Sequence, residues 1–247
     1  MTLQEFFTEH PKAAIAFSGG VDSSYLLREG LRFGRDIKAY YVKSLFQPEL
    51  EMEDAKRLAA ELGANMEIIE VDVLANTEVV KNPPNRCYYC KQAIFGTILR
   101  HAAADGYRTI LDGTNASDDA DDRPGMKALA EMRVLSPLRL CGLTKAEIRE
   151  RSRKAGLFTW DKPAYACLAT RIPSGMPITA ELLAKVEGAE GALFDMRFTD
   201  FRVRVREGGA LLQFNAAQIE EARARREEIT ERLRTWFPIL LPDWEVR

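Results

Sequence analysis

Two adjacent glycines lie where an apolar run gives way to a helical pattern, and this junction constrains the fold more than any other part of the chain. The apolar run is Ala13–Phe17, and the helical pattern that follows extends through Arg28. Between them, residues 18–24 read Ser-Gly-Gly-Val-Asp-Ser-Ser. Glycine lets a backbone approach an anion closely, and a helix N-terminus carries partial positive charge. The junction therefore predicts a phosphate-binding turn at the carboxyl end of a buried strand.

This turn differs from the two commonest nucleotide-binding motifs. It lacks the second glycine followed by Lys and Ser/Thr of a Walker A loop, and its glycines are adjacent rather than spaced as in the dinucleotide fingerprint. Without that lysine, the sequence shows no evident cation for a terminal phosphate. The structural alternative is a plain turn in which Asp22 and Ser23 cap a helix. A bare Gly-Gly would favour that alternative, whereas the full string is much more specific.

The first part of the chain alternates apolar runs with helical patterns, which is typical of βαβ units. We therefore expect an α/β fold with a mostly parallel sheet and helices on both faces. The N-terminal Met1–His10 reads as an amphipathic helix rather than a signal peptide. The expected strands are Ala13–Phe17, Ile37–Val42, Met66–Val71, Thr109–Leu111 and Arg133–Leu135, and the later helices are Pro48–Leu62, Cys90–Ala104 and Thr144–Ala155.

The alternation lapses from Phe158 to Pro177, where prolines accumulate, and a loop of that length is usually functional or a linker. Beyond it the pattern indicates a smaller α+β domain. We expect domains at 1–158 and 179–247, joined by a cysteine-bearing segment at 159–178. The expected C-terminal elements are a helix at Thr179–Ala189, a hairpin of Phe201–Arg206 and Ala210–Phe214 around Gly208-Gly209, a helix at Ala216–Arg234 and a tail strand within Pro238–Arg247.

Composition excludes several classes of protein. The chain has 247 residues, 46% of them hydrophobic, and a net charge of −2. These values are ordinary for a globular protein and argue against bulk nucleic-acid binding. No stretch approaches the roughly 18 unbroken apolar residues of a membrane span. With no export signal, we expect a cytoplasmic protein whose thiols stay reduced.

Four cysteines limit the possible metal sites. Cys87 and Cys90 form a Cys-x-x-Cys pair, Cys167 lies in the long loop, and Cys141 stands alone and is interpreted as packing. A Cys-x-x-Cys pair can bind zinc, act as a redox dithiol or ligate an iron–sulfur cluster. Structural zinc needs four Cys or His ligands, and none of the remaining candidates shows paired spacing. Three thiolates from Cys87, Cys90 and Cys167 suit a [4Fe–4S] cluster with one open iron, which could carry an extra sulfide.

The 18–24 string resembles the PP-loop of the ATP pyrophosphatase superfamily, whose adenine nucleotide alpha hydrolase-like fold matches the expected sheet. Members adenylate a substrate and release pyrophosphate. The resemblance implies that Asp22 helps to position Mg²⁺, which neutralises charge on the leaving group. It also implies a cradle for pyrophosphate made by Ser18, Gly19, Gly20, Ser23 and Ser24.

Five further motifs extend the likeness over most of residues 12–206. Together with the PP-loop they resemble the LarE-type sulfur transferases of nickel-pincer nucleotide biosynthesis. In that family, ATP adenylates a carboxylate of pyridinium-3,5-biscarboxylic acid mononucleotide, AMP leaves and a thiocarboxylate forms. The motifs are Asn82-Pro-Pro-Asn-Arg-Cys-Tyr-Tyr-Cys-Lys91, Asp112-Gly-Thr-Asn115, Arg123-Pro-Gly-Met-Lys-Ala128, Ser136-Pro-Leu-Arg139 and Lys162-Pro163 leading to Cys167-Leu-Ala-Thr-Arg-Ile-Pro173.

The family has two versions. One sacrifices the sulfur of the cysteine that matches Cys167, and the other adds the Cys-x-x-Cys pair and delivers sulfide from a [4Fe–4S] cluster. The three cysteines here indicate the cluster version. The resemblance also implies that Gly113 contacts the nucleotide, that Arg202 and Arg204 bind the substrate phosphate, and that members are often homo-oligomers. Glu190 is a weaker candidate for a metal or substrate contact.

Two stretches depart from the family pattern. The acidic residues at 118–122 make one motif longer than usual, and they could bind Mg²⁺ or form a solvated loop. After Arg206, the chain reads Glu-Gly-Gly where the family usually shows His-His-Gly-Asp. These differences affect the expected substrate end more than the ATP end.

Other functions remain open at this point. A tRNA thiolase of the same superfamily also pairs a PP-loop with cysteines, but RNA binding favours a basic surface that the net charge does not show. An amide-forming synthetase would need no cysteine trio. A non-catalytic nucleotide-binding protein with a structural metal would bind ATP without releasing pyrophosphate. For the sulfur-transferase function, a source of sulfide or another sulfur donor is also required.

Overall fold

The computed structural model describes residues 1–118, 124–207, 209–241 and 244–247. The chain divides into two compact units. The first comprises residues 1–76 and 85–162, and the second comprises residues 77–84 and 163–247. The short segment 77–84, which interrupts the first unit in sequence, is therefore part of the second.

A parallel sheet forms the centre of the first unit. Its order is β3-β2-β1-β4, and each neighbouring pair is parallel. Strands of this kind end at a common edge, and the crevice outside that edge is where open α/β sheets bind ligands. The predicted α/β class is confirmed. The strands are β1 (Lys12–Ala16), β2 (Asp36–Lys43), β3 (Asn65–Glu70) and β4 (Ile110–Leu111).

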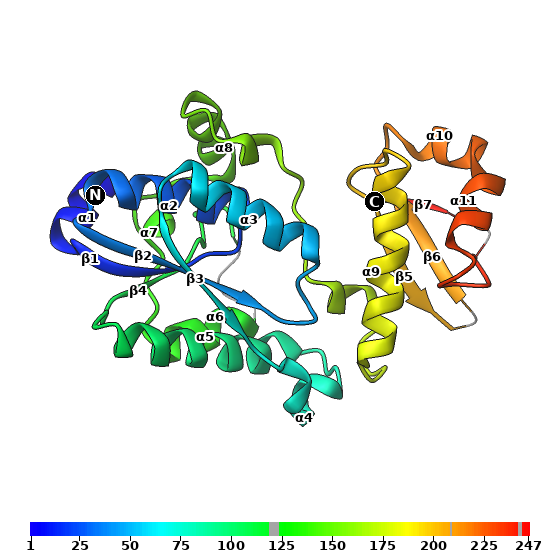
Figure 1. Ribbon diagram of the computed structural model, residues 1–247, viewed down its shortest axis with the longest axis horizontal. Helices are drawn as coiled ribbons and strands as arrows, with labels where there is room; N and C mark the ends of the chain where they lie inside the picture. Colours follow the sequence, from blue (N-terminus) through cyan, green and yellow to red (C-terminus); the bar gives the residue numbers. More distant parts are fainter. Residues whose placement is uncertain (119–123, 208, 242–243) are drawn as a thin grey trace. The chain divides into compact units, whose positions relative to one another are not determined.

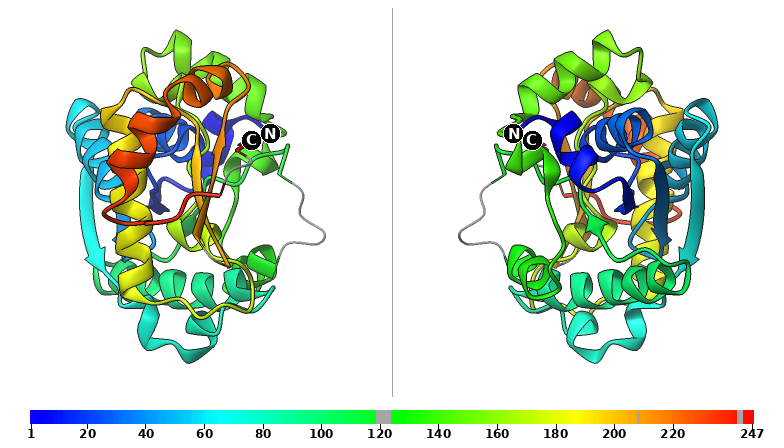
Figure 2. Two further views of the ribbon diagram at one scale, coloured as in Figure 1. Left: turned by 90° about the vertical axis from the view of Figure 1, so that its right-hand side faces the viewer. Right: turned by 90° about the vertical axis from the view of Figure 1, so that its left-hand side faces the viewer.

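Helices cover both faces of this sheet, as Figures 1 and 2 show. One buried cluster joins one face to α1, α2, α3, α7 and α8, and a second joins the other face to α5 and α6. The apolar side chains of the two central strands, β1 and β2, are almost all buried on both faces, which explains their nearly unbroken apolar runs, whereas Ile68 of the edge strand β3 is exposed. The helices are α1 (Leu3–Glu9), α2 (Val21–Phe33), α3 (Glu49–Glu61), α5 (Arg86–Ala104), α6 (Pro124–Glu131), α7 (Pro137–Leu140) and α8 (Lys145–Lys154).

The second unit is built on a smaller sheet of order β5-β6-β7. β5 and β6 are antiparallel, as the predicted hairpin requires, although Gly208 of its turn lies outside the described residues. The tail adds the short β7, parallel to β6. The strands are β5 (Arg202–Arg206), β6 (Gly209–Phe214) and β7 (Glu245–Val246), and the helices are α4 (Thr77–Val80), α9 (Ala180–Asp195), α10 (Ile219–Ala224) and α11 (Arg226–Leu233).

Two sequence expectations were wrong in detail. Arg133–Leu135 forms no strand, because Arg133 has a φ of 55° and only Leu135 bridges to Leu111. The long helix expected at Ala216–Arg234 is two helices, because the backbone leaves the α region at Arg225, where ψ is 21°. The loop after Phe158 contains only two 3₁₀ turns, Phe158–Asp161 and Leu168–Arg171.

Candidate functional site

A hollow of about 320 Å³ lies at the Ser-Gly-Gly turn of the first unit, which the sequence predicts to bind phosphate. It is open at the carboxyl ends of β1 and β4 and at the start of α2, so it occupies the position expected for a ligand in an open α/β sheet. Five of the predicted nucleotide-binding residues line it. The lining consists of Ala16, Ser18, Gly20, Asp22, Ser23, Lys91, Phe95, Asp112, Gly113, Thr114 and Asp118.

Hydroxyl groups brace the turn from within. The backbone N–H of Ser18 donates to Oγ of Ser23 at 3.2 Å, and the two Oγ atoms are 3.1 Å apart. The hydroxyl of Ser24 donates to the carbonyl of Gly20 at 2.7 Å. Ser24 is fully buried and does not line the hollow, so its hydroxyl shapes the turn. Gly20 caps the N-terminus of α2, whose unpaired N–H groups favour an anion.

Two glycines are required by space or conformation. Gly19 has a φ of 72°, and an added Cβ would lie 3.1 Å from Cβ of Ala55. At Gly113 an added Cβ would lie 3.0 Å from the backbone N of Ser23. The chain after β4 therefore passes directly against the turn, which explains why the Asp-Gly pair follows that strand.

Asp22 carries the most informative carboxylate of the hollow. Nζ of Lys145, at the start of α8, donates to its Oδ2 at 2.5 Å. Its Oδ1 is buried and has no hydrogen-bond partner among the described residues. Burial raises the pKa of Asp22, while Lys145 opposes that shift. A carboxylate oxygen without a hydrogen-bond partner, on a residue that lines the hollow, is chemically suited to a divalent cation, and the Mg²⁺ role of Asp22 stays a prediction.

Lys91 is a cationic residue of the hollow that the sequence analysis did not identify. It follows the Cys-x-x-Cys pair on α5 and lines the hollow. Burial lowers the pKa of Lys91, and the nearby Asp112 and cysteines oppose that shift. Its stem packs against Gly125 of α6, where a Cβ would lie 3.0 Å from its Cδ. The sequence shows this lysine within the cysteine motif, but no local pattern indicates that its side chain lines the hollow.

Asp112 was also missed as a member of this site. It is buried and accepts hydrogen bonds from the hydroxyls of Thr114 at 2.5 Å and Ser136 at 2.6 Å. These contacts tie the end of β4 to the segment before α7. Asp118 lines the hollow, whereas the other acidic residues of the predicted Mg²⁺ stretch, at 119–122, lie outside the described residues.

The cysteine pair begins α5 within the same unit as the hollow. Cys87 is exposed, Cys90 is half-buried, and none of the four cysteines forms a disulfide. A spacing of three places both thiols on one side of a helix. Cys167 precedes the 3₁₀ turn Leu168–Arg171 in the second unit. In the described part of the chain, no three His, Cys, Asp or Glu side chains are gathered so that they could hold a metal ion.

Glu190 lies in a buried ion pair in the second unit. Its two carboxylate oxygens accept hydrogen bonds from Nε and Nη2 of Arg171 at 2.8 and 2.9 Å, and Oε1 accepts from the N–H of Val203 at 2.9 Å. The hydroxyl of Tyr165 donates to Oε2. Glu190 and Arg171 are at most 1% exposed. Each oxygen of the Glu190 carboxylate thus accepts two hydrogen bonds from the protein, as burial of a charged group requires.

The two arginines predicted to bind a substrate phosphate contact the cysteine loop. Arg202 is buried, and its guanidinium donates to the carbonyls of Phe201 and Ala164 at 2.6 Å each. Burial lowers the pKa of Arg202 to about 10. Arg204 donates to the carbonyl of Thr170 at 3.0 Å. Their role toward a phosphate stays a prediction.

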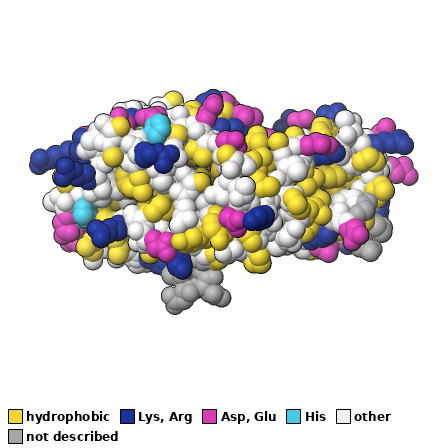
Figure 3. Space-filling model, turned by 90° about the horizontal axis from the view of Figure 1, so that it is seen from below, with side chains coloured by type: hydrophobic (Ala, Val, Ile, Leu, Met, Phe, Trp, Pro, Cys, Tyr) yellow, Lys and Arg dark blue, Asp and Glu magenta, His cyan; other side chains and the backbone are white. Residues whose placement is uncertain are grey.

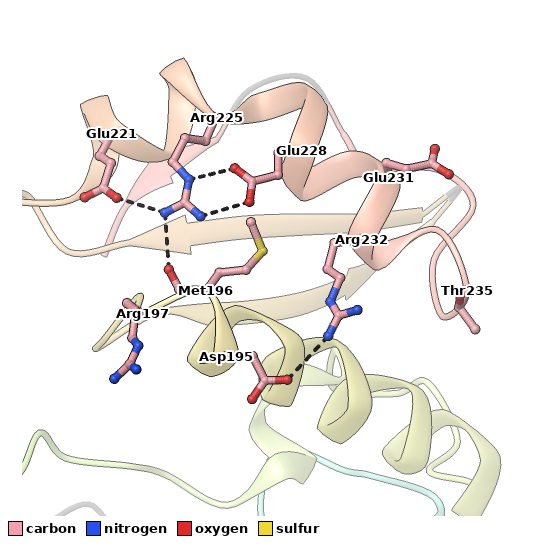
Figure 4. A pocket seen from close by; sticks show the side chains of 9 residues that line it. All are labelled: Asp195, Met196, Arg197, Glu221, Arg225, Glu228, Glu231, Arg232 and Thr235. Carbon is pink, nitrogen blue, oxygen red and sulfur yellow. Dashed lines mark hydrogen bonds and ion pairs between the residues drawn. The ribbon is translucent and has the colours of Figure 1, made fainter.

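A second, larger hollow of about 950 Å³ lies on the second unit, between the end of α9 and the helices α10 and α11 (Figure 4). Its charged groups are largely occupied with one another. Arg225 donates to Glu221 and Glu228, and Arg232 lies 3.5 Å from Asp195. These pairs connect the three helices, and the hollow offers no chemistry comparable to that of the turn.

The surface shown in Figure 3 carries basic and acidic side chains interspersed with one another. That face presents no broad basic area of the kind that nucleic-acid binding favours. Among the described helices, none combines the length and apolar content needed to cross a membrane.

Comparison with known proteins defines the family. No family model matches the chain. An uncharacterised protein of Synechocystis is 37% identical over 220 residues, covering 89% of this chain and 82% of the relative. Pyridinium-3,5-bisthiocarboxylic acid mononucleotide synthase of Lactiplantibacillus plantarum is 30% identical over 236 residues, covering 95% and 86%. A tRNA-specific 2-thiouridylase of Thermotoga maritima is 24% identical over 188 residues, covering 59% and 52%.

The parallel sheet, the Ser-Gly-Gly turn and the hollow above it define an α/β protein of the PP-loop class. Within that class, the likeness to the Lactiplantibacillus protein spans nearly the whole of both chains. The chain belongs to the LarE family, and the predicted resemblance is confirmed.

Proposed function

We propose that this protein is an ATP-dependent sulfur transferase that converts a carboxylate of pyridinium-3,5-biscarboxylic acid mononucleotide into a thiocarboxylate. The name of the Lactiplantibacillus relative supports this substrate class. The observation that carries the proposal is the position of α5, which bears Cys87 and Cys90 near its N-terminus and contributes Lys91 to the hollow at the Ser-Gly-Gly turn. The thiols proposed to carry sulfur and the lysine proposed to contact ATP thus lie close together at the start of one helix.

In the first half-reaction, a substrate carboxylate oxygen attacks the α-phosphorus of ATP, and the bond to the β-phosphate oxygen breaks. The leaving pyrophosphate carries the charge that the hollow must stabilise. The groups that would stabilise it line or border the hollow, namely the N-terminal N–H groups of α2, the hydroxyls of Ser18 and Ser23 and the ammonium of Lys91. Asp22 would hold Mg²⁺ through its unpaired Oδ1, and the cation would neutralise charge on the phosphates.

In the second half-reaction, a sulfur nucleophile attacks the acyl carbon, and AMP leaves with the electron pair of the broken C–O bond. Three thiols would hold a [4Fe–4S] cluster, namely Cys87, Cys90 and Cys167. Thiolates are the ligands that such clusters take, and the pair on α5 presents one exposed and one half-buried thiol. When bound, the cluster supplies the transferred sulfur. The alternative is sacrifice of the Cys167 sulfur itself.

Anaerobic reconstitution with iron and sulfide tests this proposal. We expect bound iron, pyrophosphate release with ATP, and thiocarboxylate product over more than one turnover. Cys87→Ala should abolish iron binding and leave adenylation measurable, whereas Cys141→Ala should change neither. Product limited to one turnover, with the Cys167 side chain converted to dehydroalanine, would establish the sacrificial route instead.

A tRNA thiolase is the second candidate, supported by the likeness to 2-thiouridylases over 59% of the chain. Incubation with ATP, a sulfur donor and either tRNA or the pyridinium nucleotide separates the two. We expect sulfur incorporation only into the nucleotide. A cytoplasmic location and a homo-oligomeric state remain predictions, the second of which can be checked by light scattering.

A further inference from the structure

Asn82 is a buried residue in a rare backbone conformation that no site described above explains. It lies between α4 and α5, in the segment 77–84 that packs with the second unit. Its φ is 53°, and its side chain is fully buried. Asparagine is among the few residues besides glycine that adopt this conformation readily. Its surroundings must therefore hold it there.

The amide of Asn82 holds a distant segment of the chain. Nδ2 donates to the carbonyl oxygens of Pro173 at 2.7 Å and Met176 at 3.1 Å, and Ile172 O is 3.4 Å away. The carbonyl of Asn82 accepts from the N–H of Gly175 at 2.8 Å. One residue thus binds a turn about ninety positions later through both its side chain and its backbone. We call these contacts the Asn82 clamp.

The clamped turn follows Cys167 by only a few residues. Between them lies the 3₁₀ turn Leu168–Arg171, in which Leu168, Ala169 and Arg171 are fully buried. Nη1 of Arg171 donates to the carbonyl of Cys167 at 3.3 Å. Because this connection is short and packed, a displacement of the clamped turn is transmitted to the Cys167 thiol.

In the sequence, Asn82 is followed closely by the cysteine pair. Pro83, Pro84, Asn85 and Arg86 separate Asn82 from Cys87. Prolines hold φ near −65°, so φ is restricted at two of these four residues. Five residues span at most about 18 Å. The clamp therefore connects the loop of one cysteine to the start of the helix that bears the other two.

We propose that Asn82 is a positioning residue for sulfur transfer, which sets the place of the Cys167 thiolate by clamping the turn after it onto the segment that leads to Cys87. This inference rests on the proposed function. It predicts that Asn82 matters for the second half-reaction and not for adenylation, because Asn82 does not line the ATP hollow.

Two substitutions separate the clamp from the backbone conformation. Asn82→Gly keeps the left-handed turn and removes the amide, whereas Asn82→Asp keeps the size and replaces the donor with an acceptor. Asn85→Gly is the matched control, because Asn85 is exposed and its side chain makes no cap hydrogen bond. The iron-free proteins are digested with trypsin under native conditions, and cleavage after the buried Arg171 is followed by mass spectrometry. Pyrophosphate release and thiocarboxylate formation are then measured on reconstituted protein.

We expect both Asn82 variants to be cut faster after Arg171 and to lose the visible absorption of the bound cluster. Thiocarboxylate formation should fall roughly a hundredfold, the effect of displacing a reacting group by about 1 Å. Pyrophosphate release should stay within about twofold of wild type. The control should match wild type in every measurement. A glycine variant that retains full thiocarboxylate formation would overturn the inference, as would equal loss of both half-reactions. If the wild type itself makes no thiocarboxylate, the proposed function fails, while the digestion still tests the clamp.

Discussion

Nζ of Lys145 lies 2.5 Å from Oδ2 of Asp22, although 123 residues separate them in the chain. The lysine donates to one oxygen of the carboxylate, and the other oxygen has no hydrogen-bond partner among the described residues. Burial raises the pKa of Asp22, and the hydrogen bond and charge of Lys145 oppose that shift. Lys145 thus contacts one oxygen of Asp22 and leaves Oδ1 for the Mg²⁺ that we propose Asp22 would bind.

The first prediction concerns the pH dependence of this pair. Mg²⁺ binds the deprotonated carboxylate, so pyrophosphate release is lost as the pH falls through the pKa of Asp22. Lys145→Met removes an interaction that lowers this pKa, and the acid limb of the pH profile should therefore move to higher pH. Lys154→Met on the same helix is the control, because its ammonium is exposed and pairs with Glu150. An unchanged acid limb would contradict the role given to Lys145.

A second prediction tests Lys91. Lys91→Met keeps much of the packing of the stem against Gly125 and removes the ammonium from the hollow. Pyrophosphate release should fall on the order of a hundredfold, as when one preorganised donor is removed from a developing charge. Lys127→Met on α6 removes an exposed lysine that does not line the hollow, and it should have no effect. Equal rates of pyrophosphate release for the two variants would contradict the role proposed for Lys91.

The close approach of β4 to the turn yields a third prediction. Gly113→Ala would place a Cβ 3.0 Å from the backbone N of Ser23, which cannot move without opening the turn. ATP binding, measured by calorimetry, should weaken strongly. Gly96→Ala is the control, since the only atom near its Cβ is the end of Arg100 at 3.9 Å. Placed within α5, that alanine should stabilise the protein by about 0.5–1 kcal/mol. Unaltered ATP affinity in Gly113→Ala would contradict the prediction that this contact between Gly113 and Ser23 shapes the turn.

The fourth prediction concerns the buried pair of Arg171 and Glu190. Glu190→Gln leaves the guanidinium without its counter-charge in a fully buried position. Breaking such a pair typically costs about 3–5 kcal/mol, which thermal and urea unfolding would detect. Glu181→Gln, on the same helix and 79% exposed, should leave the unfolding transition unchanged, because exposed ion pairs contribute little to stability. A stable Glu190→Gln variant that has lost only catalysis would instead favour the contact to metal or substrate.

The local pattern of the chain predicted the turn, the parallel sheet and the hairpin because each depends on neighbouring residues. The apolar runs, the Gly-Gly turn and the helical periods all lie within windows of about twenty residues. The helix predicted at Thr144–Ala155 is confirmed for the same reason, since Thr144 caps it: its hydroxyl accepts from the N–H of Glu147, and the Glu147 carboxylate accepts from the N–H of Thr144. The strand predicted at Arg133–Leu135 was wrong because the short apolar pattern carries no information about the positive φ of Arg133.

The sequence by itself determined the class of fold, the phosphate-binding turn and the set of cysteines, because periodicity, glycine conformation and motif spacing are properties of short segments. Only the tertiary structure decided which partners meet there. Lys145 reaches Asp22, Lys91 enters the hollow, Arg171 pairs with Glu190 and Asn82 holds the turn after Cys167. The physical reason is that strand order and the rotation of each helix about its axis set these contacts, and both depend on how the whole core packs.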